Sequence, residues 1–217
     1  MRKFCLGFFV MAAVLPAAIV STTGAGVQIN PAAGNASANA YDDAQCGTGT
    51  SDTDCPIRGW DERQEYTLVT SLTTDAYGSI PSALIASGTV INSHLIFFDP
   101  LNPANRIGSF TFDGAILGVI VGDSTLFASD FLGSASATYA SGVFERRGPE
   151  SNTDTLMISA SGNTLTLRLY ASNPGDQVRV ITLVEGGTPA EIPEPGTCAL
   201  LGVGLLGLGL LRRRDRI

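Results

Sequence analysis

Hydrophobic and polar residues alternate with a period of two over much of the chain between residues 65 and 185. In the segment 164–170, leucines at positions 165, 167 and 169 alternate with Thr166, Arg168 and Tyr170. Successive side chains of a strand point to opposite faces, so this alternation is typical of a strand with one buried face. No segment shows the 3.6-residue period of a long amphipathic helix. We therefore predict that residues 65–185 form a β-domain.

Turn-forming residues separate the alternating segments. The segment 89–98 is the strongest strand candidate, because it is rich in β-branched and aromatic residues. Ser161-Gly162-Asn163 separates two further candidates and is typical of a hairpin turn. The other predicted strands cover residues 66–72, 106–112, 116–121, 155–160, 164–170 and 177–185. Short strands at this spacing predict an all-β fold, a single jelly-roll-like β-sandwich.

The N-terminal residues have the pattern of an export signal. Met1-Arg2-Lys3 is basic, and residues 4–20 form an apolar run without a charge. Such a run enters the Sec export machinery and is then removed. We place the signal peptide at residues 1–25, with cleavage after Thr23-Gly24-Ala25. Cleavage after Ala38-Asn39-Ala40, farther downstream, and an uncleaved N-terminal anchor are the alternatives.

The C-terminal residues 193–217 contain three blocks in a fixed order, preceded by a linker at 186–192. Pro193-Glu194-Pro195 comes first, an apolar stretch at 197–211 follows, and the basic cluster Arg212, Arg213, Arg214 and Arg216 comes last. At about 1.5 Å per residue, the apolar stretch spans about 22 Å as a helix, less than the ~30 Å hydrocarbon core of a membrane. The arginines would stay on the cytoplasmic side. We therefore predict a hydrophobic helix of minimal length that acts as a transient membrane anchor.

The order of these blocks resembles the PEP-CTERM sorting signal of Gram-negative bacteria. The resemblance implies that Pro193, Glu194 and Pro195 are the sorting motif, recognised by an exosortase, a membrane transpeptidase that removes the tail. Proteins with this signal are exported and reach the cell surface or the exopolysaccharide matrix. The alternative is an ordinary C-terminal anchor that follows a chance Pro-Glu-Pro. Segments 93–100, 109–120, 129–133 and 174–182 also resemble a β-rich domain found upstream of such tails, which implies a fold but no chemistry.

Cysteine usage is consistent with export. Cys5 lies in the predicted signal peptide and Cys198 in the tail, so the exported part keeps Cys46 and Cys55. An oxidising compartment favours a disulfide between these two residues, which would close a small polar loop. That loop falls in residues 26–64, which we predict to be a loosely ordered leader. A metal or redox pair is the weaker interpretation, because CxxC spacing and a nearby histidine are missing.

The charge of the chain excludes one class of partner. The formal net charge is -7, and Lys3, the only lysine, lies in the predicted signal peptide. An acidic exported part repels nucleic acid, so we expect no nucleic-acid binding. The same charge repels anionic polysaccharide unless divalent cations bridge the two, or it simply keeps the released protein soluble.

Residues with catalytic or metal-binding chemistry are few. His94 is the only histidine, and no G-x-S-x-G sequence marks a nucleophilic serine. A Ser-His-Asp triad needs only one histidine, but we interpret His94 as a packed or hydrogen-bonded residue of a sheet. Aspartates at the predicted strand ends are oxygen ligands for Ca²⁺ or ordinary turn residues: Asp99, Asp113, Asp123, Asp130 and Asp176. We assign no catalytic residue, no metal site and no cofactor.

These observations predict an exported, non-catalytic protein of the cell surface or the exopolysaccharide matrix. Its expected partners are the Sec machinery, an exosortase and exopolysaccharide. One alternative is a polysaccharide-binding module, with or without Ca²⁺, in which Trp60 or Tyr41 would stack on sugar rings. Another is a hydrolase that uses carboxylates at the strand ends.

Overall fold

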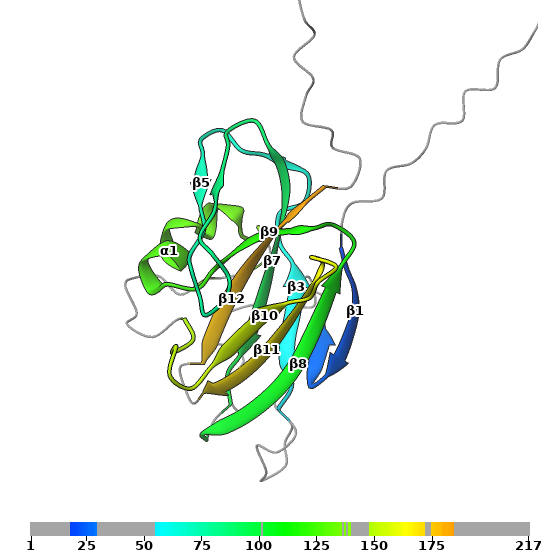
Figure 1. Ribbon diagram of the computed structural model, residues 1–217, viewed down its shortest axis with the longest axis vertical. Helices are drawn as coiled ribbons and strands as arrows, with labels where there is room; N and C mark the ends of the chain where they lie inside the picture. The colour runs from blue at the N-terminus through cyan, green and yellow to red at the C-terminus, as the bar shows by residue number, and fades with distance from the viewer. Residues whose placement is uncertain are drawn as a thin grey trace, which may run out of the picture. The chain divides into compact units, whose positions relative to one another are not determined.

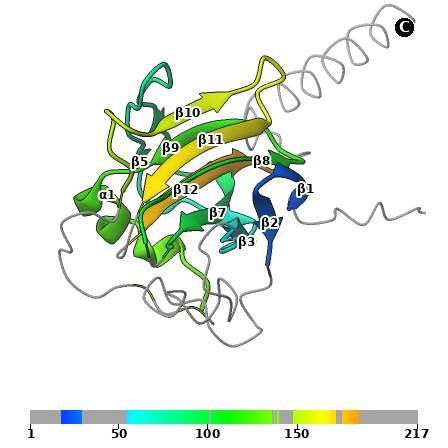
Figure 2. The same cartoon turned by 90° about the horizontal axis from the view of Figure 1, so that it is seen from below.

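The computed structural model describes residues 18–29, 55–100, 102–135, 137, 139, 148–171 and 175–184. Within these ranges the chain forms two main β-sheets, which lie one over the other as two layers (Figure 1 and Figure 2). The helical elements of the same ranges are α1 (Asp123–Ala128) and the 3-10 helix η3 (Asp130–Leu132). The all-β prediction is confirmed.

The four-stranded sheet has the order β1-β8-β11-β10, with antiparallel pairing throughout. Its strands are β1 (Ile19–Gly24), β8 (Ala104–Phe112), β10 (Thr155–Ile158) and β11 (Thr164–Ala171). The predicted hairpin turn joins β10 to β11, and Gly162 within it has a φ of 79°, which favours glycine. The sequence therefore located this hairpin correctly.

The six-stranded sheet has the order β2-β3-β7-β12-β9, and β4 also pairs with β7. Its strands are β2 (Gly26–Gln28), β3 (Ile57–Asp61), β4 (Tyr66–Thr67), β7 (Val90–Phe98), β9 (Ile116–Ile120) and β12 (Asp176–Leu183). The pair β2–β3 is parallel, whereas the other pairs are antiparallel. A separate hairpin consists of β5 (Leu72–Thr73) and β6 (Leu84–Ile85).

The main hydrophobic core lies between the two sheets. Phe110 of β8 and Leu167 of β11 contribute from one sheet, and Ile96 of β7 and Val178 of β12 contribute from the other. All four side chains are 0% exposed. Shared burial of this kind makes the domain a two-layer β-sandwich. The jelly-roll topology that we predicted is not confirmed.

The six-stranded sheet is also covered on its second face. Ile181 of β12 packs there with Leu126 of α1 and Leu132 of η3. As a result, β12 is buried at every position from Asp176 to Thr182. A strand that is covered on both faces loses the alternation of apolar and polar residues, which explains why the pattern was clearest in β11, whose outer face is partly exposed.

The N-terminal boundaries of the domain differ from the predicted ones. β2 and β3 lie inside the predicted leader 26–64, and Trp60 of β3 is 0% exposed. β1 lies inside the predicted signal peptide 1–25 and pairs with β8. The period-two pattern missed β3 because this strand, with Gly59 at its centre, is buried at four successive positions. The rest of the leader, including Tyr41 and Cys46, lies outside the described residues.

Candidate functional site

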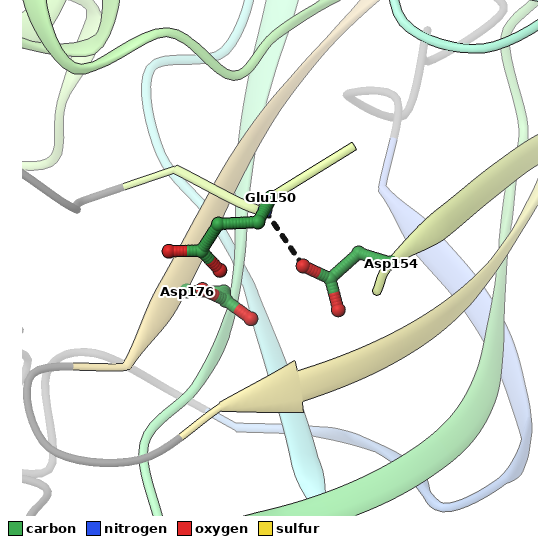
Figure 3. Close-up of side chains that lie close together, drawn as sticks. All are labelled: Glu150, Asp154 and Asp176. Carbon is green, nitrogen blue, oxygen red and sulfur yellow. Dashed lines mark hydrogen bonds between the residues drawn. The ribbon is translucent and has the colours of Figure 1, made fainter. Parts of the chain in front are cut away.

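Three carboxylates gather near one end of the sandwich. Glu150 and Asp154 belong to the loop that precedes β10, and Asp176 is the first residue of β12. One carboxylate oxygen of each residue lies within 4.8 Å of an oxygen of the other two. Figure 3 shows the side chains converging on a common space from the two segments. We call these three residues the acidic cluster.

Asp154 is held in place by the backbone of its own loop and of β11. Its Oδ2 accepts a hydrogen bond from the Glu150 amide at 2.7 Å, drawn as a dashed line in Figure 3. Its Oδ1 accepts one from the Tyr170 amide at 2.6 Å. The Thr153 hydroxyl donates a third hydrogen bond to Oδ2 at 3.3 Å. Asp154 therefore fixes the loop that carries Glu150 against the edge of the four-stranded sheet.

Asp176 occupies the end of the interior between the sheets. It pairs with Phe98 of β7 and shares a face of β12 with the core residue Val178. The preceding Gly175 lies so close to β7 that an added Cβ would be 2.0 Å from the Phe98 carbonyl oxygen, and its amide donates to Asp99 Oδ1 at 2.9 Å. Asp176 itself is 4% exposed.

The electrostatics of the acidic cluster disfavour three simultaneous negative charges. Burial raises the pKa of Asp176 to about 8, with further contributions from the charges of Asp154, Glu150 and Asp99. Burial also raises the pKa of Asp154, although the hydrogen bonds from Tyr170 and Glu150 oppose this shift. Two polar atoms here, Asp176 Oδ2 and the Tyr77 hydroxyl, are buried and have no hydrogen-bond partner among the described residues.

His94 lies at the centre of a second polar group. Its Nδ1 is 2.7 Å from Asp61 Oδ1, and its Nε2 is 3.0 Å from the Thr182 hydroxyl. The imidazole also packs against Phe112, with the ring centroids 4.6 Å apart. His94 and Thr182 are both 0% exposed. The arrangement has the residue types of a catalytic triad, and the Thr182 hydroxyl is buried.

A buried ion pair occupies the opposite face of β12. The Arg179 guanidinium donates to Glu62 through Nε at 2.7 Å and through Nη2 at 3.0 Å. Ser129 accepts a hydrogen bond from Nη1 at 2.6 Å, and Asp130 accepts one from Nη2 at 3.2 Å. These contacts tie β12 to η3 and to the segment after β3, so this group is structural.

The strand-end aspartates, for which Ca²⁺ ligation and a turn role were the alternatives, do not form one group. Only Asp176 belongs to the acidic cluster, Asp99 accepts from the Gly175 amide, and Asp130 binds Arg179. Sequence reasoning missed Glu150 and Asp154, although both stand in a polar loop before a predicted strand. Trp60, proposed for sugar stacking, is 0% exposed and packs edge-on against Phe97. It is therefore a core residue.

Several predicted sites lie outside the described residues. They are Pro193, Glu194 and Pro195 of the sorting motif, the basic cluster Arg212, Arg213, Arg214 and Arg216, and Cys46. Cys55 is buried beside β3, and its pairing with Cys46 stays a prediction. Within the described ranges, no helix has both the length and the apolar character needed to cross a membrane.

Comparison with known protein families identifies a sorting motif at the C-terminus. The family model of the PEP-CTERM protein-sorting motif matches residues 191–214, which include the Pro-Glu-Pro sequence and most of the basic cluster. No curated protein and no solved structure matches the chain. The motif supports sorting by an exosortase, a membrane enzyme, to the cell surface. The chain therefore carries a PEP-CTERM protein-sorting motif, which follows an all-β domain in the sequence.

Proposed function

We propose that this protein is a non-catalytic component of the cell surface or the exopolysaccharide matrix, exported through the Sec machinery and processed by an exosortase. The observation that carries the proposal is the sorting motif at residues 191–214. A motif of this kind acts as a substrate for the processing enzyme, so its residues are a recognition site and not a catalytic one. The β-sandwich is then the part of the protein that export delivers to the cell surface or the matrix.

The interior of the sandwich supports a non-catalytic role. The His94 group has the residue types of a hydrolase, but its hydroxyl lies between the sheets at 0% exposure. A nucleophile must reach a substrate carbonyl within about 3 Å, which a fully buried hydroxyl does not do. The Asp61–His94–Thr182 contacts instead link β3, β7 and β12 of one sheet.

Intact-mass analysis of the protein from membranes and from culture fluid tests the proposal. We expect the released form to lack the signal peptide and the tail, and to have lost two hydrogens if Cys46 and Cys55 are paired. Combined substitution of Pro193, Glu194 and Pro195 by alanine should leave the full tail in the membrane fraction. Pro189→Ala, just outside the matched motif, is the control and should be processed normally. Normal release of the triple variant would refute recognition through this motif.

Polysaccharide binding is a second candidate function, favoured by one pocket. The pocket has a volume of about 370 Å³ and lies on the outer face of the four-stranded sheet, where its lining includes Tyr170, Arg168 and Asn105. Tyr170 is 45% exposed, so its ring is available for stacking on a sugar. Arginine and amide side chains supply hydrogen bonds to hydroxyl or carboxylate groups.

Binding to exopolysaccharide isolated from the host tests this second function. Tyr170→Ala should weaken binding about tenfold, whereas Tyr170→Phe keeps the ring and should bind almost normally. Met157→Ala is the matched control, because Met157 is 57% exposed in the same sheet but does not line the pocket. Equal binding by Tyr170→Ala and the unmodified protein would exclude this pocket as the sugar site.

A further inference from the structure

We propose that Glu150, Asp154 and Asp176 form a Ca²⁺ site that joins the two sheets of the sandwich. This inference concerns the folded domain alone and does not depend on the export route or on sugar binding. It rests on the geometry of the acidic cluster (Figure 3) and on two buried polar atoms, Asp176 Oδ2 and the Tyr77 hydroxyl.

The donor set and the spacing fit Ca²⁺ among the common metal ions. Ca²⁺ takes six to eight oxygen ligands at about 2.3–2.6 Å, so ligands on opposite sides of one ion lie about 4.6–5.2 Å apart. The three carboxylate oxygens lie within 4.8 Å of one another, close enough to bind one such ion together. The cluster contains no histidine or cysteine, the ligands that Zn²⁺ prefers. Mg²⁺ requires a near-ideal octahedron and usually binds through one or two protein carboxylates and several waters, so three protein carboxylates favour Ca²⁺.

Two unpartnered polar atoms point to a ligand at this place. Asp176 is 4% exposed, yet its Oδ2 has no hydrogen-bond partner among the residues that the structure describes. Tyr77 is 8% exposed and its hydroxyl is equally without a partner in the described ranges. Burial raises the pKa of Tyr77, and the charges of Asp154, Asp176 and Glu150 raise it further. Buried polar atoms are seldom left unpaired, and a bound cation with its water ligands would satisfy both.

The site would combine rigid and adjustable ligands. Asp154 is already oriented by hydrogen bonds from Tyr170 and Thr153, and Asp176 is fixed by the start of β12. Glu150 is exposed, so its longer side chain can complete the coordination shell from the solvent side. Extracellular Ca²⁺ modules have dissociation constants on the order of 10⁻⁴–10⁻³ M, and we expect this site to fall in that range.

Ca²⁺ at this position would connect segments far apart in sequence. Asp154 leads into β10, at the edge of the four-stranded sheet, whereas Asp176 begins β12, inside the six-stranded sheet. An ion bound to both would hold the two layers together at this end of the sandwich. Binding would also remove the repulsion among the three carboxylates, so the folded state gains stability when Ca²⁺ is present.

Thermal unfolding of the full chain with Ca²⁺, Mg²⁺ or EDTA tests the proposal. If the dissociation constant is about 10⁻⁴ M, about 10 mM CaCl₂ should raise the unfolding midpoint by about 5–10 °C over EDTA, and MgCl₂ should raise it less. Glu150→Gln and Asp176→Asn should each abolish most of this increase. Glu65→Gln, which removes an exposed carboxylate outside the cluster, should keep the full increase.

The substitutions also distinguish specific Ca²⁺ binding at the proposed site from a general ionic effect of added salt. Asp154→Asn is not used, because this side chain organises its loop and the variant could fail to fold. An equal Ca²⁺ response in Glu150→Gln and in the unmodified protein would place the binding elsewhere and overturn the proposal. The absence of any Ca²⁺ response would also overturn it. Equilibrium dialysis should show one Ca²⁺ bound per chain, and none in Asp176→Asn.

Discussion

Asp176 is a buried acid whose protonation determines how the metal-free protein responds to pH. Its pKa is raised to about 8 by burial and by the charges of Asp154, Glu150 and Asp99, against about 3.9 for an exposed aspartate. Between these two values the folded state holds a proton that the unfolded state has released. The free energy of unfolding therefore falls as pH rises from about 4 to about 8.

Asp176→Asn should flatten this pH dependence. One retained proton corresponds to a slope of about 1.4 kcal/mol per pH unit, and asparagine cannot release it. We expect urea denaturation in EDTA to show the unmodified protein losing stability from pH 5 to pH 8, with a smaller loss in the variant. Tyr77 stays protonated over this range because its pKa is raised by burial and by the acidic cluster. An identical slope in both proteins would show that other groups cause the effect.

The pair Arg179–Glu62 allows a second test at the scale of residues. Both side chains are 0% exposed, so removal of one partner leaves a buried charge without its main counterion. We expect Glu62→Gln and Arg179→Met each to lower the free energy of unfolding by about 3–5 kcal/mol. The double variant should lose less than the sum of the two single losses, as a double-mutant cycle in urea would show. Additive losses would mean that the pair does not act as a unit.

At the level of single residues, the sequence predicted the setting of His94 but not its partners. His94 is a hydrogen-bonded residue of a sheet, as we predicted, but its partners Asp61 and Thr182 are 33 and 88 residues away in the sequence. The grouping of Glu150 and Asp154 with Asp176 was not predicted. It depends on how the loop before β10 is placed against β12, and the alternation of residues within one strand carries no information about this placement.

At the scale of elements, the turn between β1 and β2 shows why small residues occur there. The chain leaves the four-stranded sheet at Gly24 and enters the six-stranded sheet at Gly26. Gly24 has a φ of 64°, and a Cβ added to it would lie 2.7 Å from the Ile107 carbonyl oxygen. We interpreted Thr23-Gly24-Ala25 as a cleavage site because its residues are small, but a tight crossing between sheets requires the same property.

Gly24→Ala should destabilise the protein more than Gly78→Ala does. Both glycines have a positive φ, which costs alanine about 1–2 kcal/mol. At Gly78 nothing lies within 4 Å of the added Cβ, whereas at Gly24 the backbone of β8 must move. We expect the Gly24 variant to lose about 1–3 kcal/mol beyond the loss in the control, measured by urea denaturation. Equal losses would show that the crossing tolerates a side chain.

Strands with one exposed face were predictable from the sequence. The first and last residues of strands buried on both faces were harder to predict. β11 alternates as expected, and glycine in the turn before it marks the hairpin. β3 escaped detection, since its residues are buried on both faces and show no period of two. The helical cover of α1 and η3 was missed as well, because each is shorter than the segments in which a helical period is detectable.

At the scale of the whole molecule, the position of the mature N-terminus determines whether β1 is kept, and therefore affects the stability of the domain. Ile19 is 3% exposed in the main core, and β1 pairs with β8 from Ile19 to Gly24. Cleavage after Ala25 would remove this strand and leave β8 as an edge strand. An unpaired edge is prone to pair with another chain.

A chain that begins at Gly26 should be less stable than one that begins at Ala18. Loss of Ile19 alone removes about 1.5–3 kcal/mol of burial, and the ladder to β8 is lost as well. We expect the unfolding midpoint of the shorter chain to be lower by at least about 5 °C. N-terminal sequencing of the native protein then shows which form the cell produces. Equal midpoints would mean that β1 is dispensable.

The order of pairing along the chain also affects when the protein can fold. Ile19 pairs with Phe112, and Phe98 pairs with Asp176, so both sheets close only when distant segments meet. Proteins with such high contact order fold slowly, because the entropy of closing long loops is lost before the contacts form. A nascent chain with this topology stays unfolded until nearly all of its domain has been synthesised. Slow folding of this kind would keep the polypeptide unfolded long enough to pass through a narrow protein-conducting channel without a chaperone that holds it unfolded.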